Sequence, residues 1–366
     1  MERRYRNYIM YSCNVEMLTK QDAKMSQGLA ILAMVLLHLF CRYDLSMYNV
    51  HLFVGTTPLL YYIGLFGDIC VPIYCFSSGY AQIALWNKEQ GAYNNNRIKR
   101  LRSFLCHFWL VVCCFSIVGL VSGSSVIPGS VHAFLGNILL YHLSYNGAWW
   151  FVPTYGFLIL LSPAFIFAVK RANPLLMIIG SGSIYFVAYI LYFNYELTIT
   201  NKILEWMFEQ SLLWGRSQFS FVVGIYFYHC NVIGRIHSIF KNELLRKGII
   251  VILPVMVFVV HCFVQSLIIA PITGIVTLTS FHLWNKPVWI KKIFLFFGRH
   301  STNIWLTHMF FYLILFTGLV YVVREPVAVY LFLLAICIFV SYGIDGIETL
   351  LHNGLYRLKI TIEGKR

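Results

Sequence analysis

The chain has 366 residues, of which 59% are hydrophobic and 11% charged, with a mean hydropathy of +0.71 and a net charge of +14. A soluble domain carries about 25% charged residues, so this composition excludes an ordinary soluble protein. Apolar runs of membrane-spanning length recur along the chain, whereas period-2 alternation is weak. We therefore expect an all-α fold, a polytopic transmembrane helical bundle.

In chain order, 1–24 is predicted as a cytoplasmic or interfacial arm, 25–351 as the membrane domain and 352–366 as a basic cytoplasmic tail. The arm has no apolar h-region, which argues against a signal peptide. The segment 131–146 holds only a short, interrupted apolar run and is predicted to be re-entrant or interfacial. Ten spans are predicted, at about 25–41, 67–86, 103–122, 149–169, 174–193, 212–229, 248–266, 267–284, 302–320 and 327–350.

The basic residues predict the orientation of these spans. With both termini in the cytoplasm, 24 of the 28 Lys and Arg residues fall on the cytoplasmic side, which is a strong positive-inside bias. We therefore expect a multi-pass protein of the plasma membrane, in contact with lipids, whose charge requires no nucleic-acid partner. The ten cysteines form no CxxC pair, so neither a metal site nor a disulfide framework is expected.

His38 is the ionisable residue of the first span. It lies roughly 16 Å along a helix from Gln27, about half of a ~30 Å hydrocarbon core. An ionisable side chain at that depth usually faces a bundle interior or a polar cavity. Two interpretations follow: a catalytic base reached from both membrane faces, or a histidine hydrogen-bonded to a neighbouring helix.

A basic cluster precedes the third span and consists of Arg97, Lys99, Arg100 and Arg102. On a helix, Arg97 and Arg100 share one face, as do Lys99 and Arg102. Guanidinium forks match phosphate oxygens, and a helix N-terminus adds partial positive charge. The cluster is predicted as a phosphate site, with a positive-inside cluster at the lipid headgroups as the alternative.

Five segments together resemble the acyltransferase-3 family of integral membrane acyltransferases, which modify surface or secreted glycans, most often by O-acetylation. They are GLAILAMVLLH (28–38), ICVPIYCFSSGY (69–80), RIKRLR (97–102), AWWFVPTYGFLILLSP (148–163) and GRHSTNIWLTH (298–308). The resemblance covers nearly the whole chain. Many relatives carry a fused hydrolase-like domain, and this chain is predicted to be the standalone form.

The resemblance implies roles for three residues. His38 matches the essential histidine of an Arg-x10-His motif, and Arg97 and Arg100 match an Arg-x-x-Arg motif that binds the phosphates of acyl-CoA. The arginine position of the first motif is Gln27, with Lys24 one helical turn away, so the partner of His38 stays open.

The layout and the resemblance together predict an acyltransferase. An acyl group, by preference acetyl from acetyl-CoA, would pass to a hydroxyl of an extracytoplasmic or lipid-linked glycan acceptor, with neutral His38 as general base. Direct transfer and an acyl-histidine intermediate are both compatible with this scheme. The alternative is a carrier or flippase for a lipid-linked or small anionic substrate, and a third reading is a non-enzymatic partner in polysaccharide export.

Five further residues are candidates for substrate binding: Asp68, Trp149, Trp150, Arg216 and His308. Asp68 is predicted to orient His38, to receive a substrate hydroxyl, or to cap the second span. The tryptophan pair would stack on a sugar or anchor the interface. Arg216 would hold an acceptor or an acyl oxyanion, or snorkel to the interface. His308, at a depth like that of His38, would line the same cavity or be satisfied by a helix neighbour.

Overall fold

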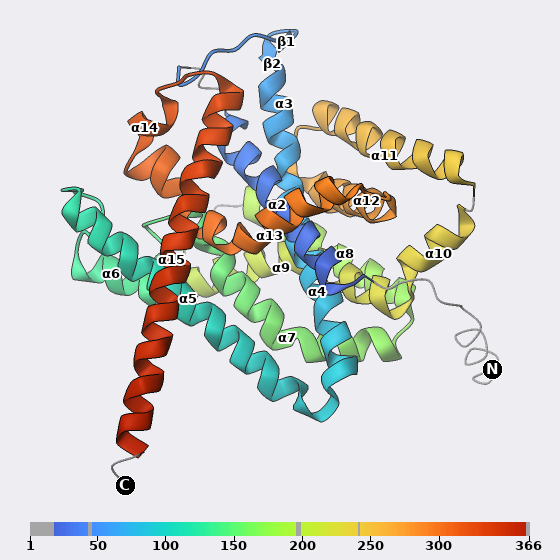
Figure 1. The fold of residues 1–366 in the computed structure, drawn as a ribbon. Helices are drawn as coiled ribbons and strands as arrows, with labels where there is room; N and C mark the ends of the chain where they lie inside the picture. Colours follow the sequence, from blue (N-terminus) through green and yellow to red (C-terminus); the bar gives the residue numbers. More distant parts are fainter. Residues whose placement is uncertain (1–17, 43–45, 195–198, 241, 364–366) are drawn as a thin grey trace.

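The computed structural model describes residues 18–42, 46–194, 199–240 and 242–363, so 1–17 of the predicted arm and 364–366 of the predicted tail lie outside the described residues. Helices form nearly all of it, which confirms the all-α class (Figure 1). The α-helices are α2 (Lys20–Phe40), α3 (Leu59–Phe66), α4 (Cys70–Glu89), α5 (Tyr93–Val121), α6 (Val131–Ile138), α7 (Phe151–Arg171), α8 (Pro174–Asn194), α9 (Lys202–His229), α10 (Val232–Ile239), α11 (Glu243–Phe263), α12 (Ala270–Leu283), α13 (Val288–Met309), α14 (Thr317–Tyr321) and α15 (Pro326–Glu363).

Short elements connect these helices. The 3-10 turns are η1 (Gly67–Ile69), η2 (Gln90–Ala92), η3 (Gly147–Trp150) and η4 (Leu267–Ile269), and η5 (Phe310–Ile314) is π-helical. Strands β1 (Phe53–Val54) and β2 (Thr57–Pro58) pair as a small antiparallel hairpin. This hairpin lies at the top of Figure 1, and the turn between α4 and α5 lies at the bottom.

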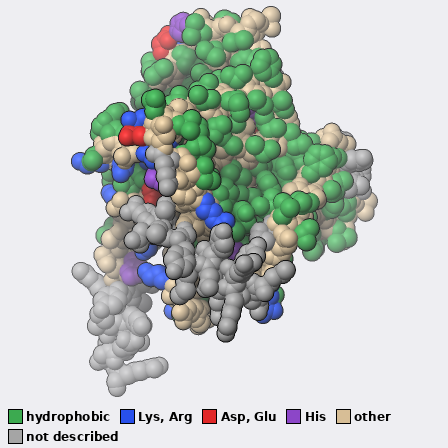
Figure 2. All heavy atoms as spheres, turned by 90° about the vertical axis from the view of Figure 1, so that its right-hand side faces the viewer, with side chains coloured by type: hydrophobic (Ala, Val, Ile, Leu, Met, Phe, Trp, Pro, Cys, Tyr) green, Lys and Arg blue, Asp and Glu red, His purple; other side chains and the backbone are tan. Residues whose placement is uncertain are grey.

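Six helical stretches in the described residues are long and apolar enough to cross a membrane, or seven if α9 and α10, bent by 63°, form one span. One of the six is the continuous stretch Leu59–Val121, which contains α3, α4 and α5. The predicted number of ten spans is not confirmed. Figure 2 shows hydrophobic side chains over much of one face, and Leu176 on α8 and Ile252 on α11 are 66% and 62% exposed. Such a surface is that of a membrane protein.

Several helices begin or end elsewhere than predicted. α2 starts at Lys20 rather than near residue 25, because Thr19 and Asp22 form a capping box that satisfies two backbone N–H groups. α5 starts at Tyr93 and so includes the basic cluster. The predicted ninth span, 302–320, is divided: α13 ends at Met309 and the π-helical turn follows. α15 continues to Glu363, so most of the predicted tail is helical.

Two glycines allow α2 and α13 to touch through their backbones. A Cβ on Gly28 would lie 2.1 Å from the carbonyl oxygen of Phe294, and one on Gly298 would lie 1.9 Å from the carbonyl oxygen of Lys24. Only glycine permits such an approach. His38 follows Gly28 by ten residues, as His308 follows Gly298. Because the two helices run in the same direction, this crossing places His38 and His308 side by side.

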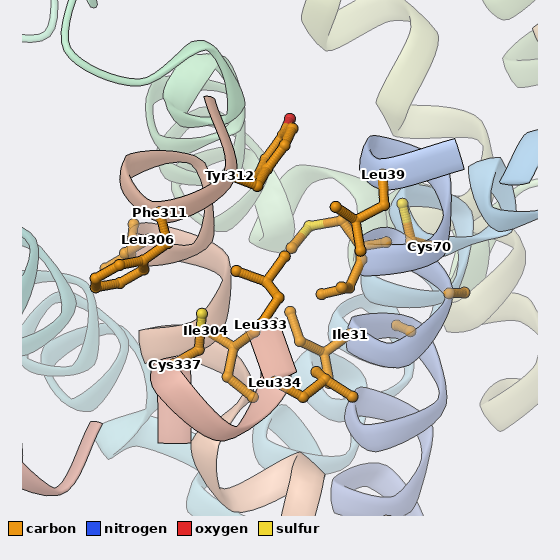
Figure 3. Close-up of a cluster of buried hydrophobic side chains, with 14 of the residues drawn as sticks. Ile31, Leu39, Cys70, Ile304, Leu306, Phe311, Tyr312, Leu333, Leu334 and Cys337 are labelled. Carbon is orange, nitrogen blue, oxygen red and sulfur yellow. The ribbon is translucent and has the colours of Figure 1, made fainter. Parts of the chain in front are cut away.

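A buried apolar cluster holds this helix pair against α15 (Figure 3). Ile31 of α2, Ile304 of α13 and Leu333 of α15 are each fully buried within it. A second glycine crossing joins α4 and α9, where a Cβ on Gly79 would lie 2.0 Å from the carbonyl oxygen of Phe221. Between helices in a membrane, close van der Waals packing is the main attraction, so these contacts keep the helices that carry the site in fixed positions.

The glycine crossing predicts opposite effects for two substitutions. Gly298→Val should lower the thermal stability of the purified protein by about 1–3 kcal/mol or more, because the side chain meets backbone that cannot move aside. Gly343→Ala in α15 meets no atom within 4 Å and should be neutral or stabilising by up to about 1 kcal/mol. Thermal unfolding followed by tryptophan fluorescence measures both. A Gly298→Val protein as stable as the parent would show that the backbones do not meet here.

Candidate active site

A cavity of about 550 Å³ lies among α2, α4, α7, α8, α9, α12 and α13. Its wall is mainly aromatic and aliphatic with a few converging polar groups, as in most ligand pockets. The polar side chains that line it are Gln27, His38, Asp68, Tyr74, Ser78, Tyr155, Tyr185, Tyr192, Arg216, Ser217, Ser301 and Thr302. The structure therefore brings His38, Asp68 and Arg216 to one cavity from three distant parts of the chain.

His38 and His308 form a hydrogen-bonded pair. His38 Nδ1 lies 2.5 Å from His308 Nε2, and the two rings stack with centroids 4.8 Å apart. His308 is fully buried, and its Nδ1 faces the carbonyl oxygens of Ile304 at 3.1 Å and Trp305 at 2.9 Å. A carbonyl only accepts, so Nδ1 of neutral His308 carries the proton and Nε2 carries the lone pair. That lone pair accepts the Nδ1–H of His38.

This pairing fixes the tautomer of His38. With the proton on Nδ1, the lone pair of neutral His38 stands on Nε2, which has no hydrogen-bond partner within the described residues and is not fully buried. His38 lines the cavity, whereas His308 lies behind it and is satisfied by its own helix and by His38. His38 thus has both the helix-neighbour bond and the cavity position that the sequence left as alternatives.

Asp68 bonds to His261, a residue that the sequence analysis did not single out. His261 Nε2 lies 2.9 Å from Asp68 Oδ2, and the two side chains are 1% and 3% exposed. His261 Nδ1 donates to the carbonyl of Val264 at 3.0 Å, so one proton is shared between Nε2 and Oδ2 and the pair is neutral overall. Asp68 Oδ1 is buried and has no hydrogen-bond partner within the described residues. The predicted orienting contact to His38 is made by His308 instead of Asp68.

Arg216 stands among aromatic rings near the C-terminal end of α8. Its guanidinium carbon lies 4.3 Å from the ring centroid of Tyr192, 4.7 Å from that of Phe193 and 5.9 Å from that of Tyr189. The side chain is half-buried and lines the cavity. The structure shows no ion pair to Arg216 within the described residues.

Arg97 connects α5 to α7. Pro163 lies inside α7 and has no N–H, which leaves the carbonyl of Ile159 without its helical partner. Arg97 Nη1 donates to the carbonyls of Ile159 at 3.0 Å and Leu160 at 2.6 Å, and the residue is only 9% exposed. Nη1 of the Arg97 guanidinium, which was predicted to bind phosphate, is therefore already bonded to α7.

The other members of the basic cluster differ in their surroundings. Arg100 Nη1 pairs with Glu89 Oε1 at 2.8 Å, while its Nε and Nη2 have no hydrogen-bond partner within the described residues. Tyr155, which lines the cavity, interacts electrostatically with Arg100. Lys99 and Arg102 are exposed. None of the four residues lines the cavity, but Phe104, one helical turn after Arg100 on α5, does, so the cluster ends about one turn from the cavity wall.

The tryptophan pair is divided between the core and the cavity. Trp150 lines the cavity. Trp149 is fully buried, its indole donates to the carbonyl of Leu306 at 3.0 Å, and it packs edge-on against Phe108. This burial argues against the predicted sugar contact for Trp149, because a sugar ring has no access to it.

A family model described as an acyltransferase domain, Acyl_transf_3, matches residues 25–346. The chain belongs to the acyltransferase-3 family. This confirms the resemblance and identifies the chain as a membrane acyltransferase. No curated protein and no solved structure matches it.

The family's arginine position in the first span is Gln27 in this acyltransferase. Gln27 lines the cavity, and its Oε1 is buried without a hydrogen-bond partner within the described residues. Lys24 does not line the cavity, and its ammonium lies 3.4 Å from the carbonyl of Gly298. Nor does any group of three or more His, Cys, Asp and Glu side chains in the described part of this acyltransferase come together to hold a metal ion.

The contact between Arg97 and α7 predicts a suppressor. Arg97→Ala should lower the stability of the protein by about 1–3 kcal/mol, because it leaves the Ile159 carbonyl of this acyltransferase buried with fewer donors. Pro163→Ala restores the helical N–H for that carbonyl, so the double variant should recover part of the loss. A double-mutant cycle on thermal stability measures the coupling. Strictly additive effects would contradict this role.

Proposed function

We propose that this acyltransferase moves an acyl group, in the simplest case acetyl, from cytoplasmic acyl-CoA to a hydroxyl of an extracytoplasmic or lipid-linked glycan. The observation that carries the proposal is the tautomer of His38, whose Nδ1–H is held by His308 and whose Nε2 lone pair belongs to a cavity wall. A neutral imidazole with one free lone pair is the form that a general base requires.

The reaction follows from this geometry. As the acceptor oxygen forms its bond to the thioester carbonyl carbon, its proton passes to His38 Nε2. The C–S bond then breaks, and the proton on Nε2 passes to the departing sulfur, which yields the ester and free CoA thiol. While His38 is protonated, its Nδ1–H bond to His308 becomes charge-assisted and therefore stronger. No oxidant, metal or further reactant is needed for this balance.

The basic cluster supports a cytoplasmic acyl donor. Arg100 keeps two donor nitrogens without partners next to the Tyr155 side of the cavity, and Lys99 and Arg102 are exposed beside it. We assign the phosphates of acyl-CoA to these three residues, with Arg97 supporting the cluster through α7. From there the thin pantetheine arm would run past Gln27 toward His38, which is roughly 16 Å of helix. This arrangement also assumes that both termini are cytoplasmic and that the membrane is the plasma membrane.

Substitutions of His38 test the proposal. His38→Ala, His38→Gln and His38→Asn should fold and bind acyl-CoA but lose about 10²–10⁴-fold in kcat, because an amide cannot accept the proton. Transfer of labelled acetyl from acetyl-CoA to glycan measures this loss. His132→Gln, at an exposed histidine of α6, is the matched control and should keep full activity. Near-normal transfer by His38→Gln would return His38 to a structural role.

His308 is predicted to act as a positioning residue. His308→Phe removes the acceptor for His38 Nδ1–H, so the lone pair of His38 is no longer confined to Nε2. We expect kcat to fall by at least about tenfold while KM for acyl-CoA stays unchanged, since loss of the correct tautomer costs up to about 10⁴-fold in a catalytic triad.

Two measurements separate this role from a packing effect. His308→Gln offers an amide oxygen as acceptor and should recover part of the activity. Nitrogen-15 NMR of histidine-labelled protein should show His38 protonated at Nδ1 in the parent and a mixture of tautomers in His308→Phe. The same tautomer in both proteins would contradict the role of His308.

A further inference from the structure

The part of the cavity lined by Asp68 and Arg216 contains one charge that the protein does not balance. Asp68 precedes α4, whose other end carries Glu89, the partner of Arg100, so this part lies away from the basic cluster. Arg216 and Asp68 are the carboxylate- or guanidinium-bearing side chains that line the cavity. Asp68 shares a proton with His261, so this pair adds no net charge. Arg216 has aromatic rings as neighbours and no ion pair within the described residues. This part of the cavity therefore carries a net positive charge.

Aromatic rings do not satisfy a guanidinium. A ring face attracts a cation, but the ring itself offers no acceptor for the five N–H donors of arginine. Tyr192 and Phe193 thus hold Arg216 in place, and the Tyr192 hydroxyl occupies one of its N–H donors, which leaves the others for a ligand. A carboxylate or a phosphate matches the guanidinium fork with two parallel hydrogen bonds.

Asp68 supplies the second half of this site. Its side chain is 97% buried at the edge of the cavity, and its Oδ1 has no hydrogen-bond partner within the described residues. A buried acceptor left unpaired destabilises the protein, and a ligand hydroxyl that donates a hydrogen bond to it would remove this cost. Tyr185 lines the cavity and interacts electrostatically with both Arg216 and Asp68, so the two groups border the same space.

We infer that Arg216 and Asp68 form the acceptor site, and that the acceptor is an anionic glycan with its carboxylate or phosphate on Arg216 and a hydroxyl on Asp68 Oδ1. This inference rests on the proposed function, because it assigns this part of the cavity to the acceptor. It goes beyond that function by naming the class of acceptor. The same chemistry fits a uronic acid and the phosphate of a lipid-linked sugar, and the experiment distinguishes them.

Binding of matched probes to the purified full chain, without any acyl donor, tests the inference. Methyl glucuronide and methyl glucoside differ by a carboxylate, and farnesyl diphosphate and farnesol differ by phosphates. At least one anionic probe should bind the parent roughly 10- to 100-fold more tightly than its neutral match, as a charged hydrogen bond would provide. Preference for the glucuronide indicates a sugar carboxylate, and preference for the diphosphate indicates a lipid-linked acceptor.

Variants connect this preference to the two residues. Arg216→Gln should abolish the preference, and Arg216→Lys should keep part of it because a point charge lacks the fork. Asp68→Asn should weaken the binding of both sugar probes, the charged glucuronide and the neutral glucoside. Lys202→Gln, an exposed cation at the start of α9, is the matched control and should leave the preference unchanged.

Three outcomes would overturn the inference: equal binding of charged and neutral probes by the parent, an anion preference that survives in Arg216→Gln, or competition by phosphatidylglycerol that equals that of both anionic probes. The last would make Arg216 a contact for lipid headgroups. If Arg216→Gln does not fold, Arg216→Lys decides the question. A lysine variant that binds the anionic probes as tightly and as selectively as the parent would exclude binding by the guanidinium fork. Since no acyl donor is present, these results are independent of whether His38 catalyses transfer.

Discussion

The backbone contact between α2 and α13 is the constraint on which the site depends. Gly28 and Gly298 let the two helices touch. Because the helices run in the same direction, they are still close ten residues later, at His38 and His308. A hydrogen bond of 2.5 Å between two ring nitrogens requires such proximity. Two carbonyls of α13 accept the Nδ1–H of His308, and this determines which nitrogens of the histidine pair carry protons. A packing feature of small residues therefore determines which nitrogen of His38 faces the substrate.

The charges around the cavity divide into satisfied and unsatisfied groups. Arg97 Nη1 donates to two carbonyls of α7, one of which Pro163 has freed, and Asp68 Oδ2 shares a proton with His261, while Asp68 Oδ1 has no partner within the described residues. Arg216 and the inner nitrogens of Arg100 have no hydrogen-bond partner of matching charge within the described residues. Unpaired polar groups at membrane depth are costly, so they mark the places where ligands supply the missing partner. Arg216 lines the cavity and Arg100 lies one helical turn from its wall at Phe104, which agrees with a donor and an acceptor that meet in the cavity.

Much of the fold class and part of the site follow from the sequence, because hydropathy and single ionisable residues in apolar runs are local signals. His38 and Arg216 were singled out in this way, and the family was inferred from five sequence segments that resemble it. The partner of His38 was not, since it depends on a register between helices separated by 270 residues. His261 stands in an apolar run much as His38 does, and the same signal could have found it. The engagement of Arg97 by α7 could not be predicted, because a freed carbonyl becomes available to it only after the helices have packed. The predicted number of ten spans is not confirmed, because helices such as α13 are not uniformly apolar over the length of a span.

The measurement that tests the central claim most directly is release of free CoA thiol by the purified chain in lipid vesicles. Acetyl-CoA is supplied on one side and a glycan mixture from the cell envelope on the other, and thiol is followed with a chromogenic disulfide. The account predicts thiol release that requires both the glycan and the intact chain, in a one-to-one ratio with new ester. Movement of acetyl-CoA or glycan across the vesicle membrane without thiol release would contradict it and would identify the chain as a carrier.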